Sequence, residues 1–339
     1  MQGKNKLSKW LNQKTFGILI SIIFLLLIFH NINFKQVLES MKSFNLIYAL
    51  PATITYALSY VVRAIRWKEL LSVSKKINYT GVLKALYIGY MANNLLPARM
   101  GELYRAHILG TEQKIKRSSA LASIVAERIF DGLTLFFLLV ILIAFFYNTP
   151  WLLQICIVTG IIFLGGFCVI IYISRSTPGS YRFIIKSINI FPEFIKNKLK
   201  IIITSFIEGL GVIKSFKGFL LILLTSITAW SLEWATMFII VSGFNLNVTI
   251  QPVTIAFLLV LVAFSTMIPS GPAFVGPYQY AFILALDMIS ISKDTALAIA
   301  VTTQFVMMAP VIVTGMILLW KSQLKLGEIP ASEEVNNLQ

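Results

Sequence analysis

The fold is decided by the segment Asn93-Asn94-Leu95-Leu96-Pro97-Ala98-Arg99-Met100-Gly101-Glu102-Leu103-Tyr104-Arg105. It places two arginines and a glutamate inside a long apolar stretch, beside a proline and a glycine. A charged residue at membrane depth costs roughly 2.5–3.5 kcal/mol on insertion scales, so it usually marks a substrate path or a buried ion pair. A helix break at that depth persists only where protein or a water-filled cavity satisfies the freed backbone groups. The segment therefore predicts a broken helix in a membrane domain, and we expect function there.

The composition is that of an all-α, polytopic membrane protein. Hydrophobic residues make up 57% of the 339 residues and charged residues 13%, and several apolar runs approach the roughly twenty residues that a spanning helix needs. We predict six full spans, at residues 16–29, 46–62, 129–147 with a helical lead-in from Ser119, 151–173, 219–243 and 295–320. The first is short. The lysines before it resemble the start of a signal sequence, but no cleavage site follows, so we expect an uncleaved helix.

Two further apolar segments, 81–110 and 252–291, do not read as simple spans because both are interrupted in the middle. The interrupting residues are Pro97 and Gly101 in the first segment, and Pro269, Gly271, Gly276 and Pro277 in the second. Each segment is predicted to enter the membrane and return to the same side as a broken re-entrant hairpin. Pro277 at a helix start would aim a helix N-terminus inward.

The net charge of +15 is unevenly distributed along the chain. Basic residues gather at the N-terminus and in the stretches 63–76, 99–117, 175–217 and 321–325. This asymmetry follows the positive-inside rule and predicts that both termini are cytoplasmic. The basic residues border spans and come without stacking aromatics on a soluble surface, which argues against nucleic-acid binding. Contact with anionic lipid headgroups is the expected secondary use.

This topology predicts two halves of opposite orientation, each consisting of a span, a broken hairpin and a span. The predicted divisions are a single membrane domain at 1–325, containing a first half at 46–147, a connector span at 151–173, a cytoplasmic basic loop at 174–218 and a second half at 219–320, followed by a short cytoplasmic tail at 326–339. Inverted repeats of this kind are typical of transporters, whose binding site lies between broken helices near the midplane. The halves have no residue-level similarity, and the alternative is two unrelated regions of irregular packing.

The charged residues after Pro97 fit a phosphate site. Arg99, Glu102 and Arg105 are spaced to align along one side of a short helix. A helix N-terminus with its free N–H groups and a guanidinium together favour phosphate. Glu102 could hold either arginine in position or meet a cationic headgroup. The alternative is an amphipathic turn at the membrane interface with solvated charges.

Two more charged clusters lie at the cytoplasmic ends of predicted spans. Glu127 and Asp131 share a helix face, and Arg128 reaches Asp131 one turn away. We interpret this cluster as a support for the arginines, with simple marking of the interface as the alternative. Arg63 and Arg66 are candidates for substrate binding, although arginines at such helix ends are usually anchors.

Glu233 lies near the centre of its predicted span. A carboxylate there must be protonated, paired or facing water. Pairing with Arg99 or Arg105 is one option, proton coupling is another, and a buried structural acid is the alternative. Conventional catalysis finds no support in the sequence. The two histidines cannot build a usual metal cluster, and nucleotide-binding loops and nucleophile triads are absent. We therefore predict no catalytic residue, metal or cofactor.

Four sequence elements in order resemble the lysylphosphatidylglycerol synthase transmembrane-region family over roughly residues 10–325. These are Arg63 and Arg66-Trp67; Asn94-Leu95-Leu96-Pro97 with Arg99, Gly101-Glu102 and Arg105; Glu127-Arg128 and Asp131; and Pro269 with Gly276. The resemblance implies a flippase-like protein, because in two-part synthases this region translocates the aminoacylated lipid that a separate cytoplasmic domain makes. Only a short tail follows Trp320, so aminoacyl transfer by this chain alone is not expected. Many members have a glutamate after the second break, where this chain has Gln279.

The predicted function is translocation of a phospholipid, glycolipid or aminoacyl lipid across the cytoplasmic membrane. Arg99 and Arg105 would bind the lipid phosphate, Glu102 and Glu233 would balance or relay charge, and the two hairpins would act as alternating gates. One alternative is a non-transporting partner of lipid-synthesis or glycosyltransferase enzymes. The other is a membrane-embedded transferase that uses Glu102, Glu127 or Asp131 as a base.

Overall fold

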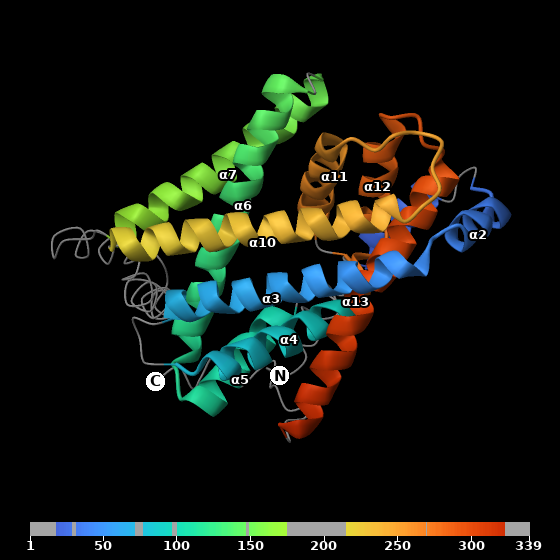
Figure 1. The fold of residues 1–339 in the computed structure, drawn as a ribbon. Coiled ribbons are helices and arrows are strands. Elements are labelled where there is room, and N and C mark those ends of the chain that lie inside the picture. The colour runs from blue at the N-terminus through green and yellow to red at the C-terminus, as the bar shows by residue number, and fades with distance from the viewer. Residues whose placement is uncertain are drawn as a thin grey trace, which may run out of the picture.

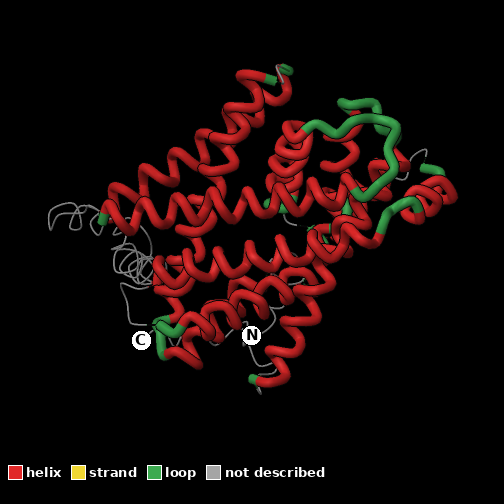
Figure 2. The backbone as a smooth tube through the Cα atoms, in the orientation of Figure 1, coloured by secondary structure: helices red, strands yellow, loops and turns green. Residues whose placement is uncertain are grey.

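The computed structural model describes residues 18–28, 32–71, 77–96, 100–146, 149–174, 215–268 and 270–322, and within these ranges every regular element is a helix (Figures 1 and 2). The helices are Ile18–Ile28, α2 (Phe34–Lys42), η1 (Leu46–Tyr48), α3 (Ala49–Leu71), α4 (Tyr79–Leu95), α5 (Gly101–Gln113), α6 (Arg117–Phe145), α7 (Pro150–Ser174), α10 (Phe216–Ser242), α11 (Pro252–Ser265), η3 (Pro272–Phe274), α12 (Pro277–Asp287) and α13 (Lys293–Lys321).

In the described part of the chain, five helices are long and apolar enough to cross a membrane. They are Leu46–Leu71, Arg117–Phe145, Pro150–Tyr172, Phe216–Ser242 and Lys293–Lys321. Large apolar side chains such as Ile161, Phe305 and Met316 are exposed on their outer faces, as expected for contact with lipid. The protein is therefore a polytopic integral membrane protein.

Within the described residues, five of the six predicted full spans are present. Of the first, predicted at 16–29, the described part is the helix Ile18–Ile28, and its two ends lie outside the described residues. The predicted span at 129–147 and its predicted helical lead-in from Ser119 form one helix, α6, which begins at Arg117. Its charged residues consequently lie in mid-helix.

The predicted interruption of segment 81–110 is present. The chain leaves α4 at Leu96 and starts α5 at Gly101, and the two helices pack against each other. The backbone N–H of Gly101 donates to Oδ1 of Asn93 at 2.7 Å. A Cβ at Gly101 would clash with the carbonyl oxygen of Gly89, so this close approach of α4 and α5 requires glycine.

The second interruption, in 252–291, separates α11 from α12, which also pack together. Gly276 has φ +102°, and Ala273 has φ +56°, so the chain turns through left-handed conformations before α12 begins at Pro277. Ser21 of the helix Ile18–Ile28 holds this turn, because its Oγ donates to the carbonyl of Val275 and accepts from the N–H of Gly271, both at 2.8 Å.

A chain of side-chain amides also fixes the second break. The N–H of Gly276 donates to Oε1 of Gln279 at 2.8 Å, and Nε2 of Gln279 donates to Oε1 of Gln304 on α13 at 2.7 Å. The amide of Gln304 then donates to the carbonyl of Ala273 at 2.5 Å. The turn is thus closed on itself through α13, and we call these three hydrogen bonds the amide relay.

The helices of the two halves make matching contacts. α3 packs along α10, and the two lie side by side through the centre of the molecule (Figure 1). α4 packs against α13, and α11 packs against α6. Likewise, α5 contacts α6 as α12 contacts α13, and α3 contacts α4 as α10 contacts α11. The contacts that α3, α4, α5 and α6 make with one another and with α10, α11, α12 and α13 therefore match when the two sets of helices are exchanged.

Candidate functional site

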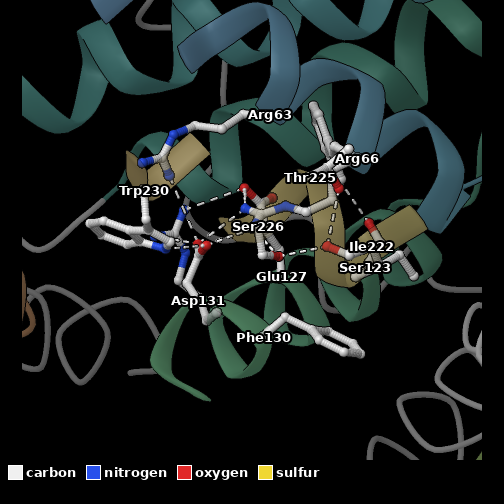
Figure 3. A network of polar contacts seen from close by, with 12 residues as sticks. Arg63, Arg66, Ser123, Glu127, Phe130, Asp131, Ile222, Thr225, Ser226 and Trp230 are labelled. Carbon is white, nitrogen blue, oxygen red and sulfur yellow. Dashed lines mark hydrogen bonds and ion pairs between the residues drawn. The ribbon is translucent and has the colours of Figure 1, made fainter. Parts of the chain in front are cut away.

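Arg66 of α3 lies at the centre of a buried network of ion pairs (Figure 3). Its Nη1 donates to Oδ1 of Asp131 at 2.6 Å and to Oγ of Ser226 at 2.8 Å. Its Nη2 donates to Oε1 of Glu127 at 3.0 Å and to Oδ2 of Asp131 at 3.1 Å. One guanidinium therefore ties α3 to α6 and α10, and its two-pronged contact with Asp131 is the strong bidentate geometry.

Arg105 brings α5 into the same network. Its Nη2 donates to Oε2 of Glu127 at 2.6 Å, so the two oxygens of this carboxylate hold arginines from two different helices. The Arg105 guanidinium lies 3.9 Å from the ring centroid of Trp67, whose indole N–H donates to Oγ of Ser123 at 2.9 Å. The stem of Arg105 runs over Gly89, where a Cβ would displace it.

The local sequence explains why these groups meet. Arg63 and Arg66 are one turn apart on α3, as are Glu127 and Asp131 on α6. The described ion pairs of this region join four arginines to four carboxylates, so the formal charges balance. Such balance is required, because an unpaired charge in a buried or lipid-surrounded position costs several kcal/mol.

A cavity of about 130 Å³ lies beside this network. Residues from both halves of the chain line it, including residues next to each helix break: Asn93, Asn94 and Glu102 at the first, and Thr266, Phe274 and Tyr278 at the second. Gln304 of the amide relay also lines it. The cavity therefore lies where the two interrupted segments converge.

Two ion pairs line this cavity, which none of the four network residues Arg66, Arg105, Glu127 and Asp131 does. The side chains of the Arg63–Glu233 pair are 6% and 16% exposed. Arg63 pairs with Glu233 of α10, and its guanidinium also lies 4.9 Å from the ring centroid of Trp230. Arg128 lies 3.5 Å from Oε1 of Glu102 and donates to the hydroxyl of Tyr90 at 3.1 Å. Both side chains of the Arg128–Glu102 pair are 27% exposed.

Tyr278 adds an uncommitted polar group to the cavity. Its side chain is 5% exposed, and its hydroxyl has no hydrogen-bond partner among the described residues. A buried hydroxyl without a partner is unfavourable by about 1–3 kcal/mol, so one that lines a cavity is a natural contact for a polar ligand. Among the described residues, no group of three or more histidine, cysteine or acidic residues could hold a metal ion.

The sequence signature of the lysylphosphatidylglycerol synthase TM region matches residues 15–315. The chain belongs to this family. It is 26% identical to a UPF0104 membrane protein of Methanocaldococcus jannaschii over 71% of this chain and 98% of that one. A second UPF0104 membrane protein of the same organism is 21% identical over 87% of this chain and 91% of its own length.

A third relative is longer than this chain. It is the glycosyltransferase AglD of Haloferax volcanii, which is 24% identical over 88% of this chain but only 53% of its own length. No solved structure matches the chain.

The predicted site residues fall into groups according to whether they line the cavity, form the buried network or shape the helix breaks. Arg63, Asn94, Glu102, Arg128 and Glu233 line the cavity. Arg66, Arg105, Glu127 and Asp131 form the buried network beside it. Gly101, Gly271, Gly276, Pro277 and Gln279 shape the two breaks. Arg99, Pro97 and Pro269 lie outside the described residues.

Among the described residues, Glu233 pairs with Arg63 and Glu102 with Arg128, two contacts that the sequence did not predict. The predicted pairing of either carboxylate with Arg99 concerns a residue outside the described part of the chain. The predicted contact of Arg128 with Asp131 is present at 3.8 Å. Sequence reasoning missed Trp230, Tyr278 and Gln304 as cavity residues. Gln304 could have been found, because an amide in the middle of an apolar span is itself a signal.

Proposed function

We propose that this protein translocates a phospholipid, or a lipid carrying a glycan or an aminoacyl group, across the cytoplasmic membrane. The observation that carries the proposal is the cavity in which both helix breaks converge and into which two arginine–carboxylate pairs face. A polar headgroup can cross hydrocarbon only if protein groups replace its hydration. The cavity offers such groups inside a bundle of membrane-spanning helices.

The matching contacts of the two halves support an inverted-repeat transporter. In this proposal α4–α5 and α11–α12 are re-entrant hairpins that enter from opposite sides, and both chain termini are cytoplasmic. The pairing of α3 with α10 forms the axis between the halves. Movement of one half against the other would expose the cavity to each side in turn, with the two breaks as gates.

Within this cavity we assign phosphate binding to Arg63 and Arg128. Both line the cavity, whereas Arg66 and Arg105 lie outside its lining and are engaged by Glu127 and Asp131. A lipid phosphate would exchange with Glu233 at the guanidinium of Arg63, because guanidinium binds phosphate and carboxylate in the same geometry. Arg99, predicted from the sequence, remains part of the proposal as a contact at the first break.

The second candidate is a non-transporting partner of lipid-modifying or glycosyltransferase enzymes. The observation that favours it is the relative named glycosyltransferase AglD, in which a region similar to this chain occupies about half the length. A membrane-embedded transferase is less well supported, since Glu127 and Asp131 each contact two or more arginines and are poorly placed to act as a base.

The test is the accessibility of labelled headgroups over time in proteoliposomes that contain fractions of native lipids. We expect Arg63→Gln to slow translocation by about tenfold or more, the effect of losing one charge-assisted hydrogen bond of roughly 1.5–3 kcal/mol. The matched control is Lys84→Gln, which removes a cation from a partly exposed pair with Glu112 that does not line the cavity.

Translocation by Arg63→Gln at the wild-type rate would contradict the assignment of Arg63. If no lipid fraction moved in folded wild-type protein, the partner function would replace transport. That function predicts copurification with a lipid-modifying enzyme, and such binding would tolerate Arg63→Gln.

A further inference from the structure

We propose that a second, apolar cavity binds a hydrocarbon chain of the same lipid whose headgroup occupies the polar cavity; this inference rests on the proposed function. The apolar cavity has a volume of about 680 Å³ and lies between α6, α7, α10 and α11. Its walls include Phe137, Leu138, Phe167, Leu223 and Ile227. For comparison, a protein cavity of roughly 150 Å³ already accommodates benzene, so this space suits a chain of many methylenes.

Four residues of its wall, Thr134, Trp230, Ser231 and Trp234, carry a polar side-chain group, and all but Ser231 donate it to a protein acceptor. Thr134 Oγ1 donates to the carbonyl of Phe130 at 2.9 Å. The indole N–H of Trp234 donates to the carbonyl of Pro252 at 3.0 Å, and that of Trp230 donates to Oδ1 of Asp131 at 3.0 Å. What these residues present to the cavity is therefore mainly carbon, which favours an apolar occupant over water.

The position of the cavity identifies the occupant. α6, α7 and α10 are three of the candidate membrane spans. Their outer faces carry exposed Ile141, Ile161 and Leu224, so this side of the molecule faces the lipid phase. The medium at such a side consists of hydrocarbon chains, and a chain can enter sideways without leaving the membrane.

Trp230 and Leu259 connect the apolar cavity with the polar one, because both residues line both cavities. Figure 3 shows Trp230 beside Asp131 and Arg63, while Phe130, which lines the apolar cavity, points away from the network. A tryptophan suits this boundary, since its N–H can be held by a polar group while its ring contacts carbon. A lipid with its phosphate at Arg63 would thus pass Trp230 with its chain extending along α10.

The test uses a diacyl phospholipid with a photoactivatable diazirine midway along one chain, bound to the full-length protein in proteoliposomes. Cross-linked peptides are identified by mass spectrometry. Leu223→Trp narrows the apolar cavity from α10, and the matched control Leu224→Trp places the same side chain on the exposed face of α10. Thr134→Leu narrows the cavity from α6 and serves as a second variant if Leu223→Trp does not fold.

We expect the wild type and Leu224→Trp to be labelled on the cavity faces of α6 and α10. In Leu223→Trp and Thr134→Leu this labelling should fall by about tenfold. Excluding two methylenes of the lipid chain from the cavity already weakens its binding by roughly 1.6 kcal/mol. Equal labelling of these faces in all four proteins would mean that the label comes from the surrounding lipid and not from a bound chain. That result would overturn the inference.

Parallel translocation measurements separate the two proposals. If Leu223→Trp and Thr134→Leu remain folded and move lipid at the wild-type rate while Arg63→Gln does not, the chain site is wrong and transport stands. If the chain labelling is lost in the cavity variants but no protein moves lipid, the chain site stands and transport is wrong.

Discussion

The buried network around Arg66 and the polar cavity contain the same chemical groups, but the surroundings of those groups differ. In the network, the side chains of Arg66, Arg105, Glu127 and Asp131 are at most 1% exposed. In the cavity, the side chains of the Arg128–Glu102 pair are 27% exposed. A fully buried pair is held by its partners and cannot be reached by a ligand. The Arg63 side chain is only 6% exposed but lines the cavity, which Arg66 and Arg105 do not. Access to the cavity, and not residue type, therefore separates the groups that build the protein from those that can bind a headgroup.

The largest effect is expected from Arg66→Met. It leaves Asp131 and Glu127 with fewer cationic partners in a buried position, and removing one partner of a buried pair destabilises by roughly 3–5 kcal/mol. Thermal unfolding in detergent should show a strongly lowered Tm or loss of folded protein. A Tm like that of the wild type would mean that the network does not hold α3, α6 and α10 together.

Gly89→Ala tests the close packing of α4 against α5, which places Arg105 in the network. The new Cβ would meet the stem of Arg105 and lie 2.9 Å from the carbonyl oxygen of Gly101, so α4 and α5 would have to separate. Overpacking of this kind typically costs about 1–3 kcal/mol. The matched control is Gly165→Ala on α7, where a Cβ meets nothing within 4 Å. Unfolding measurements that give both variants the same Tm would contradict the close packing of α4 and α5.

Glu233→Gln tests whether the ion pair of Arg63 in the cavity can be exchanged for an anionic headgroup. It removes the carboxylate that competes for Arg63 but keeps the shape of the side chain. We expect the affinity for an anionic lipid to rise by about tenfold, because the lipid no longer has to displace the Glu233 carboxylate from Arg63. Losing one charged hydrogen bond of this kind costs roughly 1.5 kcal/mol, which corresponds to about tenfold in affinity. Native mass spectrometry with phosphatidylglycerol measures the binding. A lower affinity in Glu233→Gln would show that the carboxylate supports the bound headgroup.

The smallest effect is expected from Lys84→Gln. The pair of Lys84 with Glu112 has a short N–O distance of 2.6 Å, yet both side chains are about a quarter exposed. Such pairs contribute roughly 0–1 kcal/mol. The Tm should change little and should depend only weakly on salt. A loss comparable to that of Arg66→Met would contradict the distinction between buried and exposed pairs.

The sequence predicted the local features of this molecule well. The two helix breaks follow from prolines and glycines in apolar segments, and the contact of Arg128 with Asp131 follows from helical spacing. The helix breaks and the Arg128–Asp131 contact depend only on residues within one or two helical turns of each other.

Contacts between distant segments were not predictable in the same way. Arg63 and Arg66 looked like anchors at a helix end, but α3 continues to Leu71, and their partners come from α6 and α10. Charged residues normally lower the expectation of a span, so the predicted ends fell short. Pairing of opposite charges between helices removes that penalty, and only the tertiary structure reveals the pairs.

The amide relay at the second break has a consequence for the response of this protein to acidity. Gln279 and Gln304 hold the turn without any group that gains or loses a proton. A glutamate at position 279 would bring a titratable group to the same place. The three hydrogen bonds of the amide relay therefore do not titrate, and acidification that leaves the fold intact should leave the second break in place.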